Sequence, residues 1–112
     1  MNARLAVANT EEEAILLSNL LQHSQTTFQE AWIGRYFDGN IWTTVDGIAV
    51  ADSGYEGWAD GEPNRLRRTR ADNSIEFEAC GSLHWNMQHN DDYCTSTHPF
   101  ICEFYNSPCT NL

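Results

Sequence analysis

The feature that most constrains the fold is a long stretch, from Asp46 to Asn73, that shows neither helical nor strand periodicity. It is broken up by glycine, proline, aspartate and asparagine, the residue types that form turns. Loops of this length are uncommon in compact domains unless they are functional or disordered. Tyr55 and Trp58 lie within the stretch, and such large aromatic side chains favour a loop that packs against the domain. The chain is therefore expected to carry a long, ordered loop.

The residues before the loop predict one helix and two strands. In residues 9–24, Thr10 is a plausible N-cap and Glu13 completes a capping box, followed by leucines at helical spacing. Residues 31–37 and 40–45 are rich in aromatic and β-branched side chains, which is typical of strands.

The residues after the loop add further strands. Residues 75–85 and 98–104 are strand candidates, whereas residues 86–97 are polar and are expected to form turns. The fold class predicted for the chain is therefore α+β: an early helix and short antiparallel strands, with a long structured loop between them.

The composition excludes several classes of partner. A chain of 112 residues forms one domain. Its net charge of −10 argues against nucleic acid and against anionic membrane surfaces. No apolar run reaches the roughly 20 residues that span a bilayer, and the N-terminus does not read as a secretory signal. Four of the six basic residues lie within six positions of one another: Arg65, Arg67, Arg68 and Arg70. Their positive charges either offset nearby acidic side chains or contact an anionic ligand.

Four cysteines, all in the last third of the chain, indicate disulfides. They are Cys80, Cys94, Cys102 and Cys109. An even number in a small, loop-rich chain is typical of an oxidising compartment and so of a secreted, extracellular protein. No CxxC spacing is present, which disfavours zinc-ribbon and redox interpretations. A bridge between Cys80 and Cys94 would hold the residues on either side of it near each other.

Oxygen-bearing side chains form three groups that could bind a hard cation. They are Glu62 with Asn64, Glu76 with Glu78, and Asn90 with Asp91 and Asp92. Calcium takes six to eight oxygens from carboxylates, amides and carbonyls. From the residues alone, a calcium site and scattered surface acid both remain open.

Zinc and catalytic interpretations find less support. His84, His89 and His98 lie among the cysteines, but their spacing matches no standard zinc site, and disulfide-bonded cysteines cannot bind zinc. Ser74 and Ser82 lack the surroundings of a nucleophile. Glu62 and Glu78 could in principle act as an acid/base pair, but nothing in the sequence separates their pKa values. The chain is not expected to be an enzyme.

Taken in order, several segments resemble a C-type lectin domain. They are NARLAVANTEEEAILLSNLL, AWIG, DSGYEGWADGEPN, EFEAC, NDDYC and PFICEF. The resemblance implies a C-type lectin-like fold over residues 1–104 and a tail at residues 105–112. The chain is then expected to begin inside the first helical region, without the family's first strand and part of its first helix.

The resemblance also implies a site. Its Ca²⁺ ligands would be Glu62, Asn64, Glu78, Asn90 and Asp91, with Cys80 bridged to Cys94. Vicinal hydroxyls of a sugar would bind the ion and the first four of these side chains. The Glu62–Pro63–Asn64 order implies mannose-type sugars (mannose, fucose, N-acetylglucosamine), where Gln-Pro-Asp would imply galactose. The resemblance also implies a cis Glu62–Pro63 peptide.

Three departures from the family pattern qualify this interpretation. The Trp-Asn-Asp run is not intact, so Asn86 and Asp92 are secondary ligand candidates. Arg65 and Ala79 stand where an auxiliary calcium site would need acids, which predicts a single ion. Cys102 lacks its usual upstream partner, and it pairs with Cys109, pairs with a cysteine before Met1, or stays free.

The predicted function is that of a secreted, calcium-dependent carbohydrate-recognition domain that binds mannose-type glycans, in innate recognition or cell adhesion. Binding at single sites of this kind is weak, so an oligomer would supply avidity. The alternative is a calcium-independent lectin-like module for protein interaction. Neither nucleic acid binding nor membrane insertion is expected.

Overall fold

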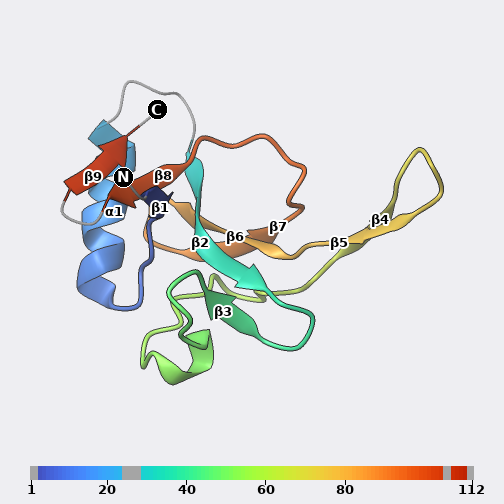
Figure 1. Ribbon diagram of the computed structural model, residues 1–112, viewed down its shortest axis with the longest axis horizontal. Coiled ribbons are helices and arrows are strands. Elements are labelled where there is room, and N and C mark those ends of the chain that lie inside the picture. Colours follow the sequence, from blue (N-terminus) through green and yellow to red (C-terminus); the bar gives the residue numbers. More distant parts are fainter. Residues whose placement is uncertain (1–2, 24–28, 105–106, 111–112) are drawn as a thin grey trace.

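The computed structural model describes residues 3–23, 29–104 and 107–110 (Figure 1). The elements are β1 (Ala3–Leu5), α1 (Glu11–His23), β2 (Glu30–Phe37), β3 (Trp42–Thr44), a 3₁₀ turn (Val50–Asp52), β4 (Arg67–Thr69), β5 (Ile75–Phe77), β6 (Cys80–His84), β7 (His89–Asp92), β8 (Ile101–Phe104) and β9 (Ser107–Thr110). With one α-helix and antiparallel sheets in the described residues, the fold is α+β, as predicted.

The strands form three small sheets. The central one has four strands in the order β3-β2-β6-β7, and a second has the order β1-β8-β9. The hairpin β4-β5 forms the third and projects away from the body of the domain (Figure 1). A parallel bridge between Trp32 and Phe100 connects β2 to the segment that enters β8.

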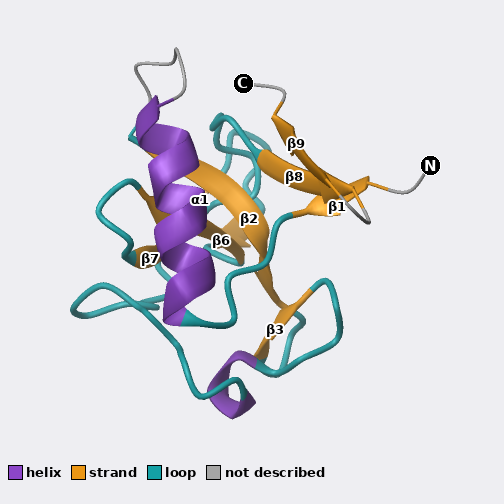
Figure 2. Cartoon of the chain, turned by 90° about the vertical axis from the view of Figure 1, so that its left-hand side faces the viewer, coloured by secondary structure: helices purple, strands orange, loops and turns teal. Residues whose placement is uncertain are grey.

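Helix α1 forms and packs as its sequence predicts. The Glu13 N–H donates to Thr10 Oγ1 over 3.1 Å, and the Asn9 N–H donates to Glu13 Oε1 over 3.0 Å, which completes a capping box. The helix lies across the central sheet (Figure 2). Its buried face joins the core of the domain, made of Ala6, Ala8, Ala14, Leu17, Leu21, Ala31, Ile33, Leu83 and Ile101.

The long loop is ordered and is fixed to β7. Trp58 forms a parallel bridge with His89, and the His89 carbonyl accepts the Ala59 N–H over 2.8 Å. The indole of Trp58 also meets that of Trp42 edge-on, with ring centroids 5.0 Å apart. The prediction that the loop packs against the body of the domain is confirmed.

Four segments differ from the sequence predictions. Residues 86–97 were expected to form turns, but His89–Asp92 is strand β7, because its backbone pairs with β6. The end of the expected loop forms strand β4, which pairs with β5. Strand β1 precedes the helix and pairs with β8, although no strand was expected there. Residues 107–110, expected to be part of a tail, form β9 beside β8.

Candidate functional site

The Glu62–Pro63–Asn64 tripeptide forms a tight turn within the long loop. The Glu62–Pro63 peptide bond is cis, which confirms the prediction. The Glu62 N–H donates to the Ala59 carbonyl over 2.9 Å. The Asn64 N–H donates to Glu62 Oε1 over 3.1 Å, and this hydrogen bond holds the Glu62 side chain against the turn.

Asp91 joins this turn to β7. Its side chain is fully buried. One carboxylate oxygen accepts the Asn64 N–H over 3.3 Å, and the other accepts the Arg65 N–H over 2.7 Å. These two hydrogen bonds hold the loop against a carboxylate of the central sheet. Burial, followed by the adjacent Asp91 carboxyl, raises the pKa of Glu62.

Glu78 lies between β5 and β6, beside the same turn. It is 7% exposed. The Leu66 N–H donates to its Oε1 over 3.3 Å, and the Glu78 N–H donates to the Leu66 carbonyl over 2.8 Å. Burial, then the negative charge of Asp91, raises the pKa of Glu78 to about 7. A carboxyl with so high a pKa lacks a compensating cation.

Asn90 has a side-chain oxygen that accepts no hydrogen bond within the described part of the chain. It lies on β7 directly opposite Ser82 of β6. Its side-chain Oδ1 is buried and, among the described residues, has no hydrogen-bond partner. Buried polar atoms are normally satisfied, so this oxygen is available to a water or a ligand. Asn90 lies on the same face of β7 as Asp92, whereas Asp91 points to the other face.

The structure brings the five predicted ligands together only in part. Glu62, Asn64, Glu78 and Asp91 are joined by the hydrogen bonds and electrostatic effects above. Within the described residues, however, the carboxylate oxygens of Glu62, Glu78 and Asp91 are not all within 4.8 Å of one another.

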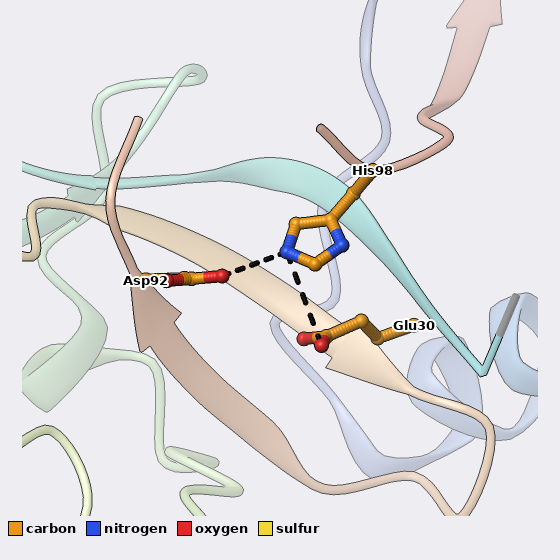
Figure 3. Close-up of side chains that lie close together, drawn as sticks. All are labelled: Glu30, Asp92 and His98. Carbon is orange, nitrogen blue, oxygen red and sulfur yellow. Dashed lines mark hydrogen bonds and ion pairs between the residues drawn. The ribbon is translucent and has the colours of Figure 1, made fainter. Parts of the chain in front are cut away.

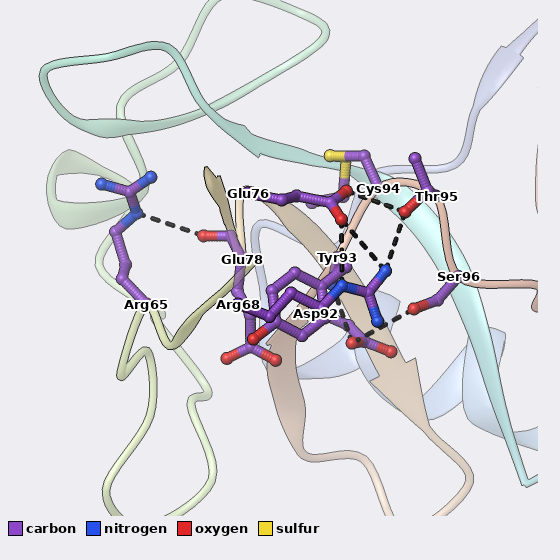
Figure 4. Close-up of a disulfide and its surroundings, with 10 residues drawn as sticks. Arg65, Arg68, Glu76, Glu78, Asp92, Tyr93, Cys94, Thr95 and Ser96 are labelled. Carbon is purple, nitrogen blue, oxygen red and sulfur yellow. Dashed lines mark hydrogen bonds and ion pairs between the residues drawn. A yellow bond between two sulfur atoms is a disulfide. The ribbon is translucent and has the colours of Figure 1, made fainter. Parts of the chain in front are cut away.

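The other oxygen-bearing candidates point elsewhere. Glu76 accepts a hydrogen bond from Arg68 over 3.0 Å and one from Thr95 over 2.8 Å (Figure 4). Asn86 bonds to Gln88. These two side chains therefore do not join the group around Glu62.

Asp92, the other secondary candidate, also faces away from Glu62. Its Oδ2 lies 2.7 Å from His98 Nε2, and its Oδ1 accepts the Tyr93 N–H over 2.7 Å. Its neighbour Glu30 was missed by sequence reasoning, and His98 was considered there only for a zinc site with the cysteines. No local motif contains them, since they come from distant parts of the chain.

The disulfide predicted between Cys80 and Cys94 is present, with their Cα atoms 5.1 Å apart. It ties the start of β6 to the segment that leaves β7. Cys102 is also disulfide-bonded, so the alternative in which it stays free is wrong. In the register of β8 and β9, Cys102 lies opposite Cys109.

Two arginines of the basic window lie over aromatic rings. The Arg65 guanidinium is 3.9 Å from the ring centroid of Phe37, and its Nε–H donates to the Glu78 carbonyl over 3.1 Å. The Arg68 guanidinium is 3.9 Å from the ring centroid of Tyr93. These two residues support the loop and the hairpin through cation–π contacts, which residue spacing could not indicate.

His89 serves the structure of the site. It is fully buried, and its Nδ1 lies 3.2 Å from the Gly57 carbonyl. Burial lowers its pKa to about 3, so the ring is neutral. The zinc site considered for His84, His89 and His98 with two cysteines does not form, because Cys80 and Cys94 are joined in a disulfide.

Comparison with known proteins identifies the family. Residues 1–104 match the model of the Lectin C-type domain. C-type lectin 1 of Hydrophis hardwickii is 32% identical over 92% of this chain, and C-type lectin domain family 4 member F of Mus musculus is 30% identical over 88% of it. The chain spans 58% and 16% of the lengths of these two proteins.

Solved structures agree with that result. The carbohydrate-recognition domain of the human scavenger receptor C-type lectin superposes with a TM-score of 0.67 at 25% identity, covering 89% of this chain and 70% of that one. The mouse counterpart gives a TM-score of 0.68 at 26% identity and the same coverage. Among the described residues, no helix is long and apolar enough to cross a membrane. With a matching family model, similar relatives and a common fold, the chain belongs to the C-type lectin domain family.

Proposed function

We propose that the domain binds carbohydrate in a calcium-dependent way, using Glu62, Asn64, Glu78, Asn90 and Asp91, and that it prefers mannose-type sugars. The observation that carries the proposal is the convergence of the Glu62–Pro63–Asn64 turn on Asp91. The backbone N–H of Asn64 and that of the next residue, Arg65, donate to the two oxygens of this buried carboxylate. A carbohydrate-recognition domain of similar fold among the solved structures supports the ligand class.

The five proposed ligands suit a hard divalent cation. Three acidic side chains and two amides supply oxygens, the atoms that calcium prefers. The raised pKa of Glu78, which lies beside the Glu62 turn, marks a place where positive charge is lacking. When bound, calcium would accept sugar hydroxyls as further ligands. The order Glu62–Asn64 would then place one acceptor and one donor beside those hydroxyls, which favours mannose-type over galactose-type sugars.

The proposal implies an extracellular protein that is not an enzyme and whose partners are glycans. Single sites of this kind bind weakly, and an oligomer would supply avidity. The proposal also implies a single ion, because Arg65, whose guanidinium lies on Phe37, stands where a second calcium ion would need an acidic side chain. A role in innate recognition or cell adhesion would follow from such glycan binding.

Calorimetry with mannose and with galactose tests the proposal. Mannose should bind in calcium and should not bind after a chelator is added, whereas galactose should bind weakly or not at all. The double variant Glu62→Gln with Asn64→Asp should shift the preference toward galactose. Glu76→Gln is the matched control, because Glu76 bonds to Arg68 and Thr95 outside the site.

Two results would contradict the proposal. Mannose binding that is indifferent to the chelator would remove the calcium requirement. Absent sugar binding in a folded, calcium-loaded protein would instead favour the calcium-independent protein-interaction module.

A further inference from the structure

A second cluster of metal-binding side chains lies on the other side of β7, away from the Glu62 turn. Glu30 is the first residue of β2, Asp92 is the last of β7, and His98 lies in the segment before β8 (Figure 3). His98 Nε2 is 2.7 Å from Asp92 Oδ2 and 3.9 Å from Glu30 Oε1. One ligand atom from each residue lies within 4.8 Å of the other two. We name Glu30, Asp92 and His98 the histidine cluster.

The carboxylates of the histidine cluster are held by neighbours outside it. The hydroxyl of Ser82, which is fully buried, donates to Glu30 Oε2 over 2.7 Å. The Tyr93 N–H donates to Asp92 Oδ1 over 2.7 Å. Each carboxylate therefore uses one oxygen for a supporting hydrogen bond and turns the other toward His98. Supporting bonds of this kind orient the ligands of metal sites.

The imidazole of His98 is also fixed in place. It meets the Trp32 ring edge-on, with centroids 4.7 Å apart and an interplanar angle of 74°. The backbone near it is held as well, because the Trp32 N–H donates to the Pro99 carbonyl over 2.8 Å. The three side chains thus have little freedom to turn away from one another.

Charge and exposure suit a small cation. Within the described part of the chain, the salt bridges of Glu30 and Asp92 go to His98 alone. Two carboxylates with one imidazole stay net negative whether or not the ring is protonated. The side chains are 26%, 23% and 15% exposed, so an ion can enter while the ligands remain sheltered from bulk water.

We propose that the histidine cluster binds a divalent transition-metal ion of the zinc type, through His98 Nε2 and one oxygen from each of Glu30 and Asp92. An imidazole ligand suits zinc rather than calcium, which takes oxygen ligands. Three protein ligands leave at least one position of a tetrahedral zinc ion for water or for a group from a binding partner. This site is separate from the calcium site, since Asp91 and Asp92 point to opposite faces of β7.

Titration of the folded protein with zinc chloride, with calcium at saturation, tests the proposal. We expect one calorimetric zinc site in the unmodified chain, and a loss of zinc affinity of at least about tenfold in His98→Gln and in Glu30→Gln. Both glutamines keep a hydrogen-bonding side chain of similar length. His23→Gln is the control, because His23 lies on α1 and bonds to the Asn19 carbonyl.

A second measurement separates a metal site from a structural ion pair. Cobalt chloride should give a ligand-field absorption spectrum that zinc displaces, and this spectrum should be absent in His98→Gln while calcium binding is unchanged. If His98→Gln fails to fold, Glu30→Gln gives the same comparison. The histidine cluster is a metal-free ion pair, and the proposal is overturned, if the unmodified protein binds no zinc or if the folded variants bind it equally well.

Discussion

Replacing Glu78 with glutamine should stabilise the metal-free protein at neutral pH while abolishing calcium binding. The two effects have one cause. Glu78 is 7% exposed and faces the charges of Asp91, Asp92 and Glu62, which is why its pKa rises from 4.5 to about 7. Glutamine keeps an oxygen for the Leu66 N–H, which Glu78 Oε1 accepts over 3.3 Å, but carries no charge.

The size and sign of the effect follow from proton linkage. The folded protein holds the Glu78 proton at pH values at which the unfolded chain has released it. The free energy of unfolding therefore falls as the pH rises from about 4.5 to about 7, and the loss is complete above that range. A rise in pKa from 4.5 to about 7 corresponds to roughly 3 kcal/mol. We expect Glu78→Gln to recover about 1–3 kcal/mol above pH 7, because structural relaxation around the buried charge reduces the full value.

Thermal unfolding in chelator, followed by circular dichroism between about pH 5 and pH 8, measures this effect. The melting temperature of Glu78→Gln should exceed that of the unmodified protein above pH 7 by several degrees, at about 4–8 °C per kcal/mol. The difference should shrink as the pH falls toward 5.

Glu76→Gln is the matched control. Glu76 pairs with Arg68 and Thr95, and the Thr95 hydroxyl, more than Arg68, lowers the pKa of its carboxyl. Its replacement should leave the melting temperature unchanged or slightly reduced. The reasoning fails if Glu78→Gln destabilises the chelated protein above pH 7, or if it retains calcium affinity equal to that of the unmodified chain.

Two further predictions concern stability alone. Thr10→Ala removes the N-cap acceptor of the Glu13 N–H and should reduce the free energy of unfolding by about 1 kcal/mol in urea titrations; an unchanged midpoint would contradict the capping assignment. Cys80→Ser with Cys94→Ser opens a bridge with a sequence separation of 14 and should cost about 3 kcal/mol. The same double variant should weaken calcium binding, because the strand after Glu78 would no longer be tied to the segment that follows Asp91, and equal calcium affinity would show that the site does not depend on the bridge.

Local patterns explain what the sequence predicts correctly. The capping box and the leucine stripe of α1 involve residues three or four apart, and both appear in the structure. Strand β2 follows from its aromatic and β-branched residues. The Glu62–Pro63–Asn64 turn could be recognised because its three residues are contiguous, and the cis peptide and its approach to Asp91 follow the family pattern.

Long-range assembly explains what the sequence misses. Strand β7 is polar throughout, so no alternation of apolar residues marks it, and only its pairing with β6 makes it a strand. Ser82 and Glu30, which support the histidine cluster, are 52 residues apart in sequence. Hydrophobic periodicity contains no information about which distant polar residues will meet.

The register of β7 against β6 determines which of Asp91 and Asp92 faces the Glu62 turn and which faces His98. Successive side chains of a strand point to opposite faces, so Asp91 meets the Glu62 turn and Asp92 meets His98. A slip of one residue would exchange them. Gly81 of β6 lies opposite Asp91, and a side-chain carbon at Gly81 would come within 2.9 Å of the backbone of Arg35 in β2. A glycine at this position therefore lets β6, which carries β7 in this register, pack closely against β2.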